Sequence, residues 1–203
     1  MTAAATTPNR ARRTCLRAIA AGGWLTGLGS VGLIGLVKGA QAADTVPPPP
    51  DLAQSLPGAR LQGQVRYRWF GIAIYDARLW GRERVGADDY AQHEFVLELQ
   101  YARNLGGADI AERSLGEMRK VGAFTDAQGA AWLAAMKAVF PDVHPGDRLT
   151  GWHRPGQGVA FHHNGKPAGS VADPAFAPLF FGIWLSPRNG EAALRASLLG
   201  LAP

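Results

Sequence analysis

Arginines gather in one part of the sequence, and arginine is the side chain best suited to hold a carboxylate ligand. Between positions 60 and 84 there are only two acidic residues but six arginines, namely Arg60, Arg66, Arg68, Arg78, Arg82 and Arg84. An arginine that faces a cleft could bind a ligand carboxylate through two parallel hydrogen bonds. The alternation of the segment also allows a plainer interpretation, in which these side chains form a solvated outer face of a sheet.

Histidines and carboxylates offer weaker candidates for metal or acid–base chemistry. His162 and His163 are neighbours in a predicted strand, so their side chains point to opposite faces and cannot easily share one ion. Asp142, His144 and Asp147 lie close together, but the prolines and glycine around them predict a tight turn whose Asp side chains cap backbone groups. The sequence has no G-x-S-x-G motif and no other nucleophile with an evident base. We therefore expect no metal and no cofactor, and the sequence assigns no catalytic residue.

The positive charge of the chain comes from its N-terminal part. The 203 residues include 21 basic and 16 acidic side chains, a net charge of +5. Residues 1–42 hold five of the basic residues and no acidic one, which leaves 16 of each sign in the other 161. This balance argues against a basic, nucleic-acid-binding body. The single cysteine, Cys15, also lies in this segment, which excludes disulfides, thiolate metal sites and a catalytic cysteine from residues 43–203.

Residues 1–42 are predicted to be a signal peptide. The pair Arg12-Arg13 precedes an uncharged apolar segment at 18–37, and Ala40-Gln41-Ala42 places small residues where a signal peptidase cuts. The paired arginines followed by Leu16 resemble a twin-arginine export signal. We expect a periplasmic or secreted mature protein with no stable membrane span. The alternative is a retained anchor, because about 20 apolar residues can cross a bilayer.

The elements that must position the candidate residues follow from periodicity. Residues 43–58 are predicted to be a Pro-rich linker, since the four prolines at 47–50 fit neither a helix interior nor a central strand. In residues 59–203, alternation predicts strands and 3.6-residue periodicity predicts helices. The expected strands are 61–69, 72–80, 94–101, 149–153, 159–163 and 168–171, and the expected helices are 109–121, 125–140, 173–180 and 191–199. Hairpin-joined strands with helices grouped on one side imply one α+β domain.

Two local motifs support particular boundaries. Thr125, three residues before Gln128, predicts a capping box at the start of the second helix. Asn164-Gly165 between two predicted strands is a strong hairpin motif. The segment around Phe180 and Trp184 is the most apolar of residues 43–203, so it is expected to form core or to line a cavity.

The domain at 59–203 resembles the bacterial chalcone isomerase-like family. The resemblance is carried by GIAIYDARLW at 71–80, IAERSLGEM at 110–118, FPDV at 140–143, GDRL at 146–149, NG at 164–165, DPAF at 173–176 and FFGIWLSP at 180–187. These motifs follow one another in the expected order from about Leu61 to Leu199. The resemblance implies an open-faced β-sandwich, in which a curved antiparallel sheet is covered by helices.

The resemblance also implies that the reaction of the plant enzymes is lost. Those enzymes cyclise chalcones with an early arginine and threonine, a tyrosine and asparagine on the following helix, and a late hydroxyl residue. In this sequence the threonine falls near Trp69 or Phe70, the tyrosine near Ile110, the asparagine near Glu117 and the late hydroxyl near Leu179. None of these side chains retains the required chemistry, and only an arginine remains, at Arg66.

Non-catalytic relatives with this fold bind fatty acids in the same cleft through an arginine and a tyrosine. We therefore expect an exported, non-catalytic protein that binds a small apolar or acyl ligand, with Arg66, Tyr75 and Glu117 as ligand-binding residues. One alternative is an intramolecular lyase or isomerase of the chalcone isomerase type that uses other residues, such as Glu117 with Arg66. Another is an interaction module with a filled core. Oligomeric state is not assigned.

Strand alternation raises an objection to Arg66. Arg66 and Arg68 share one strand face, and the apolar Tyr67 and Trp69 share the other and have the stronger claim to lie under the helices. Arg66 would reach the cleft only if the cleft opened on the far side of the sheet or a bulge changed the alternation.

Overall fold

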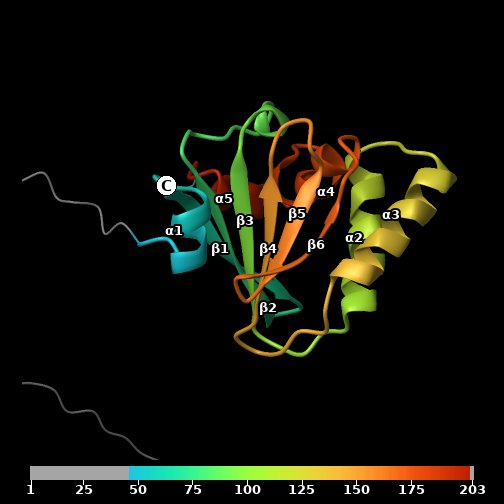
Figure 1. Ribbon diagram of the computed structural model, residues 1–203, viewed down its shortest axis with the longest axis horizontal. Helices are drawn as coiled ribbons and strands as arrows, with labels where there is room; N and C mark the ends of the chain where they lie inside the picture. Colours follow the sequence, from blue (N-terminus) through green and yellow to red (C-terminus); the bar gives the residue numbers. More distant parts are fainter. Residues whose placement is uncertain (1–45, 202–203) are drawn as a thin grey trace, which may run out of the picture. The chain divides into compact units, whose positions relative to one another are not determined.

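Six strands pair in sequence order into a single antiparallel sheet, and two helices lie in the connection between the third and fourth strands (Figure 1). The computed structural model describes residues 46–201. The strands, which lie in the sheet in sequence order, are β1 (Arg60–Trp69), β2 (Ile72–Gly81), β3 (Phe95–Tyr101), β4 (Arg148–His153), β5 (Val159–His163) and β6 (Lys166–Val171). The predicted β5–β6 hairpin is present, with Asn164 and Gly165 at φ values of 51° and 80°. Both residue types accept this left-handed conformation, which a two-residue hairpin loop requires.

Four helices cover one side of the sheet, which we call the inner face. They are α2 (Gly107–Val121), α3 (Asp126–Val139), α4 (Phe176–Leu185) and α5 (Ala192–Leu198), and a short 3-10 turn, η1 (Tyr90–Gln92), lies between β2 and β3. Alternate strand residues such as Leu79, Leu97 and Phe161 point to this face and are buried. They form one core with Met118 of α2 and Phe181 of α4. The predicted α+β fold with a helix-covered antiparallel sheet is confirmed.

Helix α3 begins where its local motif predicts, whereas α4, expected from Asp173, begins only at Phe176 and also ends later than expected. The Thr125 hydroxyl accepts a hydrogen bond from the backbone N–H of Gln128, and the Gln128 side chain accepts one from the Thr125 N–H, so the predicted capping box is present. Helix α4 continues to Leu185 instead of ending at Phe180. Its additional turn packs in the core, because the residues from Phe180 to Leu185 are all buried.

A fifth helix lies on the opposite side of the sheet, which we call the outer face. The predicted linker is helical at α1 (Pro50–Ser55), whose opening proline stands where no intrahelical N–H is needed. Leu52 and Leu56 of this segment are 1% exposed and pack against Trp80 and Trp152 in a second, smaller core. Part of the segment expected to be an extended tether therefore packs on the sheet.

Within residues 46–201, no helix is both long enough and apolar enough to span a bilayer. The predicted signal peptide, residues 1–42, lies outside the described residues.

Candidate ligand-binding site

A pocket of about 590 Å³ lies between the inner face of the sheet and helices α2, α4 and α5. Its lining is mainly apolar, with contributions from Trp69, Ile74, Leu99, Leu105, Ile110, Phe140, Leu149, Phe180, Ile183, Trp184 and Leu194. Pockets of roughly 300–1,000 Å³ with apolar walls and a few polar groups are typical of sites for small organic ligands. The apolar segment of α4 thus serves both roles expected from the sequence, since it forms core and lines a cavity.

A β-bulge in β2 shapes one wall of the pocket. Tyr67 of β1 pairs with Tyr75, and the next residue, Arg68, pairs with Ala73, which leaves Ile74 as the extra residue. A bulge interrupts the strict alternation of a strand. As a result Ile74 and Tyr75, although adjacent in sequence, both line the pocket.

Three tyrosines, together with Ser114 and Asn189, supply neutral polar groups to the pocket lining. The indole N–H of Trp184 donates a hydrogen bond of 3.0 Å to the hydroxyl of Tyr75. The ring of Tyr75 stacks on Tyr67, with 5.1 Å between centroids, and meets the edge of Tyr101 at 6.0 Å. Burial raises the pKa of Tyr75 and of Tyr101 far above the ordinary value. Both phenols therefore stay protonated at neutral pH, where they can donate a hydrogen bond but cannot act as bases.

Charged side chains of α2 stand where the pocket meets solvent. Glu117, only 15% exposed, forms ion pairs with Arg113 at 3.0 Å and with Lys120 at 2.8 Å. The two cations are 59% and 61% exposed, and the Arg113 guanidinium also lies 5.1 Å from the ring centre of Trp69. Asp109 and Glu191 add two further carboxylates to the lining. The interior is thus neutral, and the mouth carries charges of both signs.

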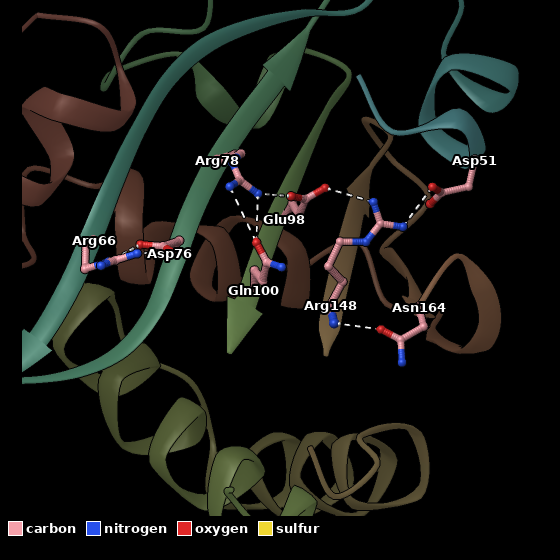
Figure 2. Close-up of polar contacts among 8 residues, drawn as sticks. All are labelled: Asp51, Arg66, Asp76, Arg78, Glu98, Gln100, Arg148 and Asn164. Carbon is pink, nitrogen blue, oxygen red and sulfur yellow. Dashed lines mark hydrogen bonds and ion pairs between the residues drawn. The ribbon is translucent and has the colours of Figure 1, made fainter. Parts of the chain in front are cut away.

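The structure brings two of the three predicted site residues to the pocket. Tyr75 and Glu117 line it, whereas Arg66 lies on the outer face. There its guanidinium forms a two-point ion pair with Asp76, with N–O distances of 2.7 and 2.8 Å (Figure 2). The objection from strand alternation is correct, because the bulge lies in β2 and leaves Tyr67 and Trp69 of β1 facing inward. The arginine expected to bind a ligand is held by a surface carboxylate instead.

The same geometry separates Arg66 from Glu117. The two residues lie on opposite sides of the sheet, so they cannot act together on one substrate, as the alternative enzymatic hypothesis requires. Arg78 also belongs to the outer face, where it pairs with the buried Glu98 at 2.7 Å (Figure 2). For these two arginines of the 60–84 cluster, the plainer interpretation as part of an outer sheet face is the one that the structure supports.

Several pocket residues were not singled out from the sequence. Arg113 and Lys120 are four residues before and three after Glu117, so a helical projection would have placed all three on one stripe of the predicted helix. Tyr67 and Tyr101 belong to the inward face of predicted strands, which identifies them as core without revealing a cavity. The Tyr75–Trp184 hydrogen bond joins residues 109 positions apart, and no local pattern predicts it.

Comparisons with known proteins agree with this architecture. The family model described as chalcone isomerase-like matches residues 57–200. An uncharacterized protein of Haemophilus influenzae is 28% identical over 138 residues, which cover 68% of this chain and 66% of that protein. The crystal structure of a fatty-acid binding protein from Arabidopsis thaliana superposes with a TM-score of 0.56 over 70% of this chain and 87% of the other, at 13% identity. At that identity the superposition shows a shared fold.

Proposed function

Because the chain belongs to the chalcone isomerase-like family, we propose that it is an exported, non-catalytic protein that holds a small apolar or acyl ligand in the pocket described above. The observation that carries the proposal is the pocket itself, about 590 Å³ in volume with apolar walls and neutral hydroxyl groups inside. The fold shared with a plant fatty-acid binding protein supports an acyl ligand. Export rests on the predicted signal peptide alone.

The chemistry of the lining argues against cyclisation of a chalcone. Trp69 and Ile110 line the pocket near the positions where the resemblance puts the threonine and tyrosine of the plant enzymes, and neither can exchange a proton. Tyr75 keeps its proton because its pKa is raised by burial. The lining holds three carboxylates, those of Asp109, Glu117 and Glu191, and the carboxylate of Glu117 is held in ion pairs with Arg113 and Lys120. The hydroxyl groups that the resemblance implies for the plant reaction are therefore missing at these two positions, Trp69 and Ile110.

The distribution of charge indicates how an acyl ligand would lie. A carboxylate deep in the pocket would meet only neutral donors such as Tyr75, and burying a charge without a counter-charge is costly. At the mouth, Arg113 and Lys120 retain N–H groups that face solvent. The acyl chain would therefore occupy the interior, with its polar end beside α2. The carboxylates of Asp109 and Glu191 favour a single, weakly acidic or neutral polar end over a multiply charged one.

A titration of the protein with palmitate, monitored by calorimetry, tests the proposal. The wild-type protein should bind one equivalent saturably, and Ile74→Trp, which adds volume to the pocket wall, should weaken binding strongly. Arg66→Ala is the matched control, since it removes a large side chain from the outer face of the same hairpin and should leave the affinity unchanged. The proposal would be refuted if the protein bound no palmitate and no apolar compound co-purified with it. Equal affinities of wild type and Ile74→Trp would place the ligand elsewhere.

A further inference from the structure

The tip of the β1–β2 hairpin exposes large apolar side chains. Trp69, Phe70 and Ile72 are 47%, 88% and 53% exposed, and the other exposed large apolar side chains among residues 46–201 are Val46 and Leu201. Trp69 and Phe70 contact each other edge to face at 4.9 Å, so they form a single apolar surface. Three of five exposed large hydrophobic residues therefore gather at one turn, a concentration that usually marks a binding surface.

The backbone of this turn is unfavourable for the residue it carries. Phe70 has φ 46° and Gly71 has φ 80°, the two left-handed positions of a tight hairpin loop. Asn, Asp or Gly adopts this conformation readily, whereas a bulky residue rarely does. Burial does not compensate for the strain, since the side chain is 88% exposed. A strained residue whose side chain is not buried in the core points to a function outside the folded domain.

Cations lie beside the apolar tip. Arg68 is exposed and donates a hydrogen bond of 3.1 Å to the carbonyl of Gly71 within the turn. Arg113, 59% exposed, lies over the ring of Trp69. Aromatic side chains flanked by arginines are typical of surfaces that insert into the interface of a bilayer with anionic lipids.

The tip is continuous with the mouth of the pocket. Trp69 belongs both to the exposed tip and to the pocket lining, and Ile74, two residues after Ile72, lines the pocket as well. A hairpin inserted into a membrane would therefore hold the pocket mouth close to the lipid surface. An acyl ligand could then pass between bilayer and pocket with little exposure of its chain to water.

We propose that the β1–β2 tip is a membrane-docking surface that binds anionic bilayers and through which the pocket exchanges its ligand. The exchange rests on the proposed function, whereas docking itself does not. The partner is a lipid surface, recognised by the apolar tip and by the positive charges of Arg68 and Arg113.

Flotation of the protein with vesicles of phosphatidylcholine, with or without phosphatidylglycerol, tests the docking. The test variant is Phe70→Asn, because asparagine accepts the left-handed backbone and the variant should fold at least as stably as wild type. Partitioning onto phosphatidylglycerol vesicles should fall about tenfold or more, since the most exposed apolar side chain of the tip is lost. Leu201→Asn, which removes an exposed apolar side chain outside the hairpin, should partition like wild type. Wild-type binding should also weaken with salt and be lower on pure phosphatidylcholine.

The outcomes separate docking from ligand binding. Phe70→Asn should bind palmitate in solution with the affinity of the wild type. It should transfer bound palmitate to vesicles more slowly than the wild type. Equal vesicle binding by wild type and Phe70→Asn would overturn the docking proposal. The docking proposal would also be overturned if the wild type formed a dimer, did not bind vesicles, and became monomeric in Phe70→Asn. The tip would then bind a second copy of the chain. Vesicle binding without palmitate binding would refute the proposed function and still support the docking surface.

Discussion

Replacing Glu98 with glutamine should destabilise the fold through the outer face of the sheet. Glu98 lies in the middle of β3, and its side chain is 1% exposed. Its carboxylate accepts hydrogen bonds from Arg78 at 2.7 Å and from Arg148 at 3.4 Å (Figure 2). Arg148 in turn contacts Asp51 of α1 at 2.8 Å, so the network connects three strands with the outer helix.

The loss of stability in Glu98→Gln depends on the solvent exposure and the remaining partners of Arg78 and Arg148. Removing one member of a buried ion pair costs about 3–5 kcal/mol when the partner is left unpaired in the interior. Here Arg78 and Arg148 remain 25% and 19% exposed, and Arg148 retains Asp51. Since water and Asp51 partly compensate the loss, we expect Glu98→Gln to lower the free energy of unfolding by about 2–3 kcal/mol. For a domain of this size that loss corresponds to about 5–10 °C in Tm.

A neighbouring ion pair provides the matched control. Asp76→Asn makes the same chemical change in the Arg66–Asp76 pair, whose side chains are 56% and 27% exposed. An exposed pair contributes at most about 1 kcal/mol, so this variant should remain close to wild type. Urea denaturation followed by circular dichroism measures both effects. If Glu98→Gln proved no less stable than Asp76→Asn, the assignment of Glu98 as a structural charge would be refuted. Neither variant should change palmitate affinity, because both sites face away from the pocket.

Four further predictions concern the ligand, catalysis, acid stability and export. Arg113→Ala should weaken palmitate binding about threefold to tenfold by calorimetry, whereas an unchanged affinity would remove this cation from the ligand's polar end. The purified protein should not accelerate chalcone cyclisation above the uncatalysed rate in an absorbance assay, and a clear acceleration would restore the enzymatic alternative. Hydrogen bonds from Asn164 and His144 lower the pKa of Asp147 to about 2, below its unfolded value, so this carboxylate stabilises the fold above about pH 4 and loses that contribution as the pH falls towards 2. Asp147→Asn should therefore flatten the fall in Tm over that interval, and identical profiles would contradict the assignment. Changing Arg12 and Arg13 together to lysine should leave the precursor in the cytoplasm, and normal export on an immunoblot would indicate the general secretory route.

Local patterns predicted most of the elements and, for the first strand, the side chains that turn inward. Alternation identified β1 to β6 within a few residues, because neighbouring side chains of a strand point to opposite faces wherever the strand lies. The motifs at Thr125 and Asn164 were equally local, since each side chain or turn residue acts on backbone within three positions. Helix α1 escaped prediction, because a helix of six residues has little stability of its own and forms here against Trp80 and Trp152.

The sequence by itself indicated the fold family and most of the strands and helices, and the alternation of its first strand already opposed Arg66 as a ligand residue. Only the tertiary structure decided that Ile74 lines the pocket beside Tyr75, because the bulge depends on how two strands pair. It also decided that Trp184 bonds to Tyr75 and that the charged stripe of α2 stands at the mouth. A pocket is the space left between elements that pack together, so its lining depends on contacts between distant residues, which no periodicity within one segment encodes.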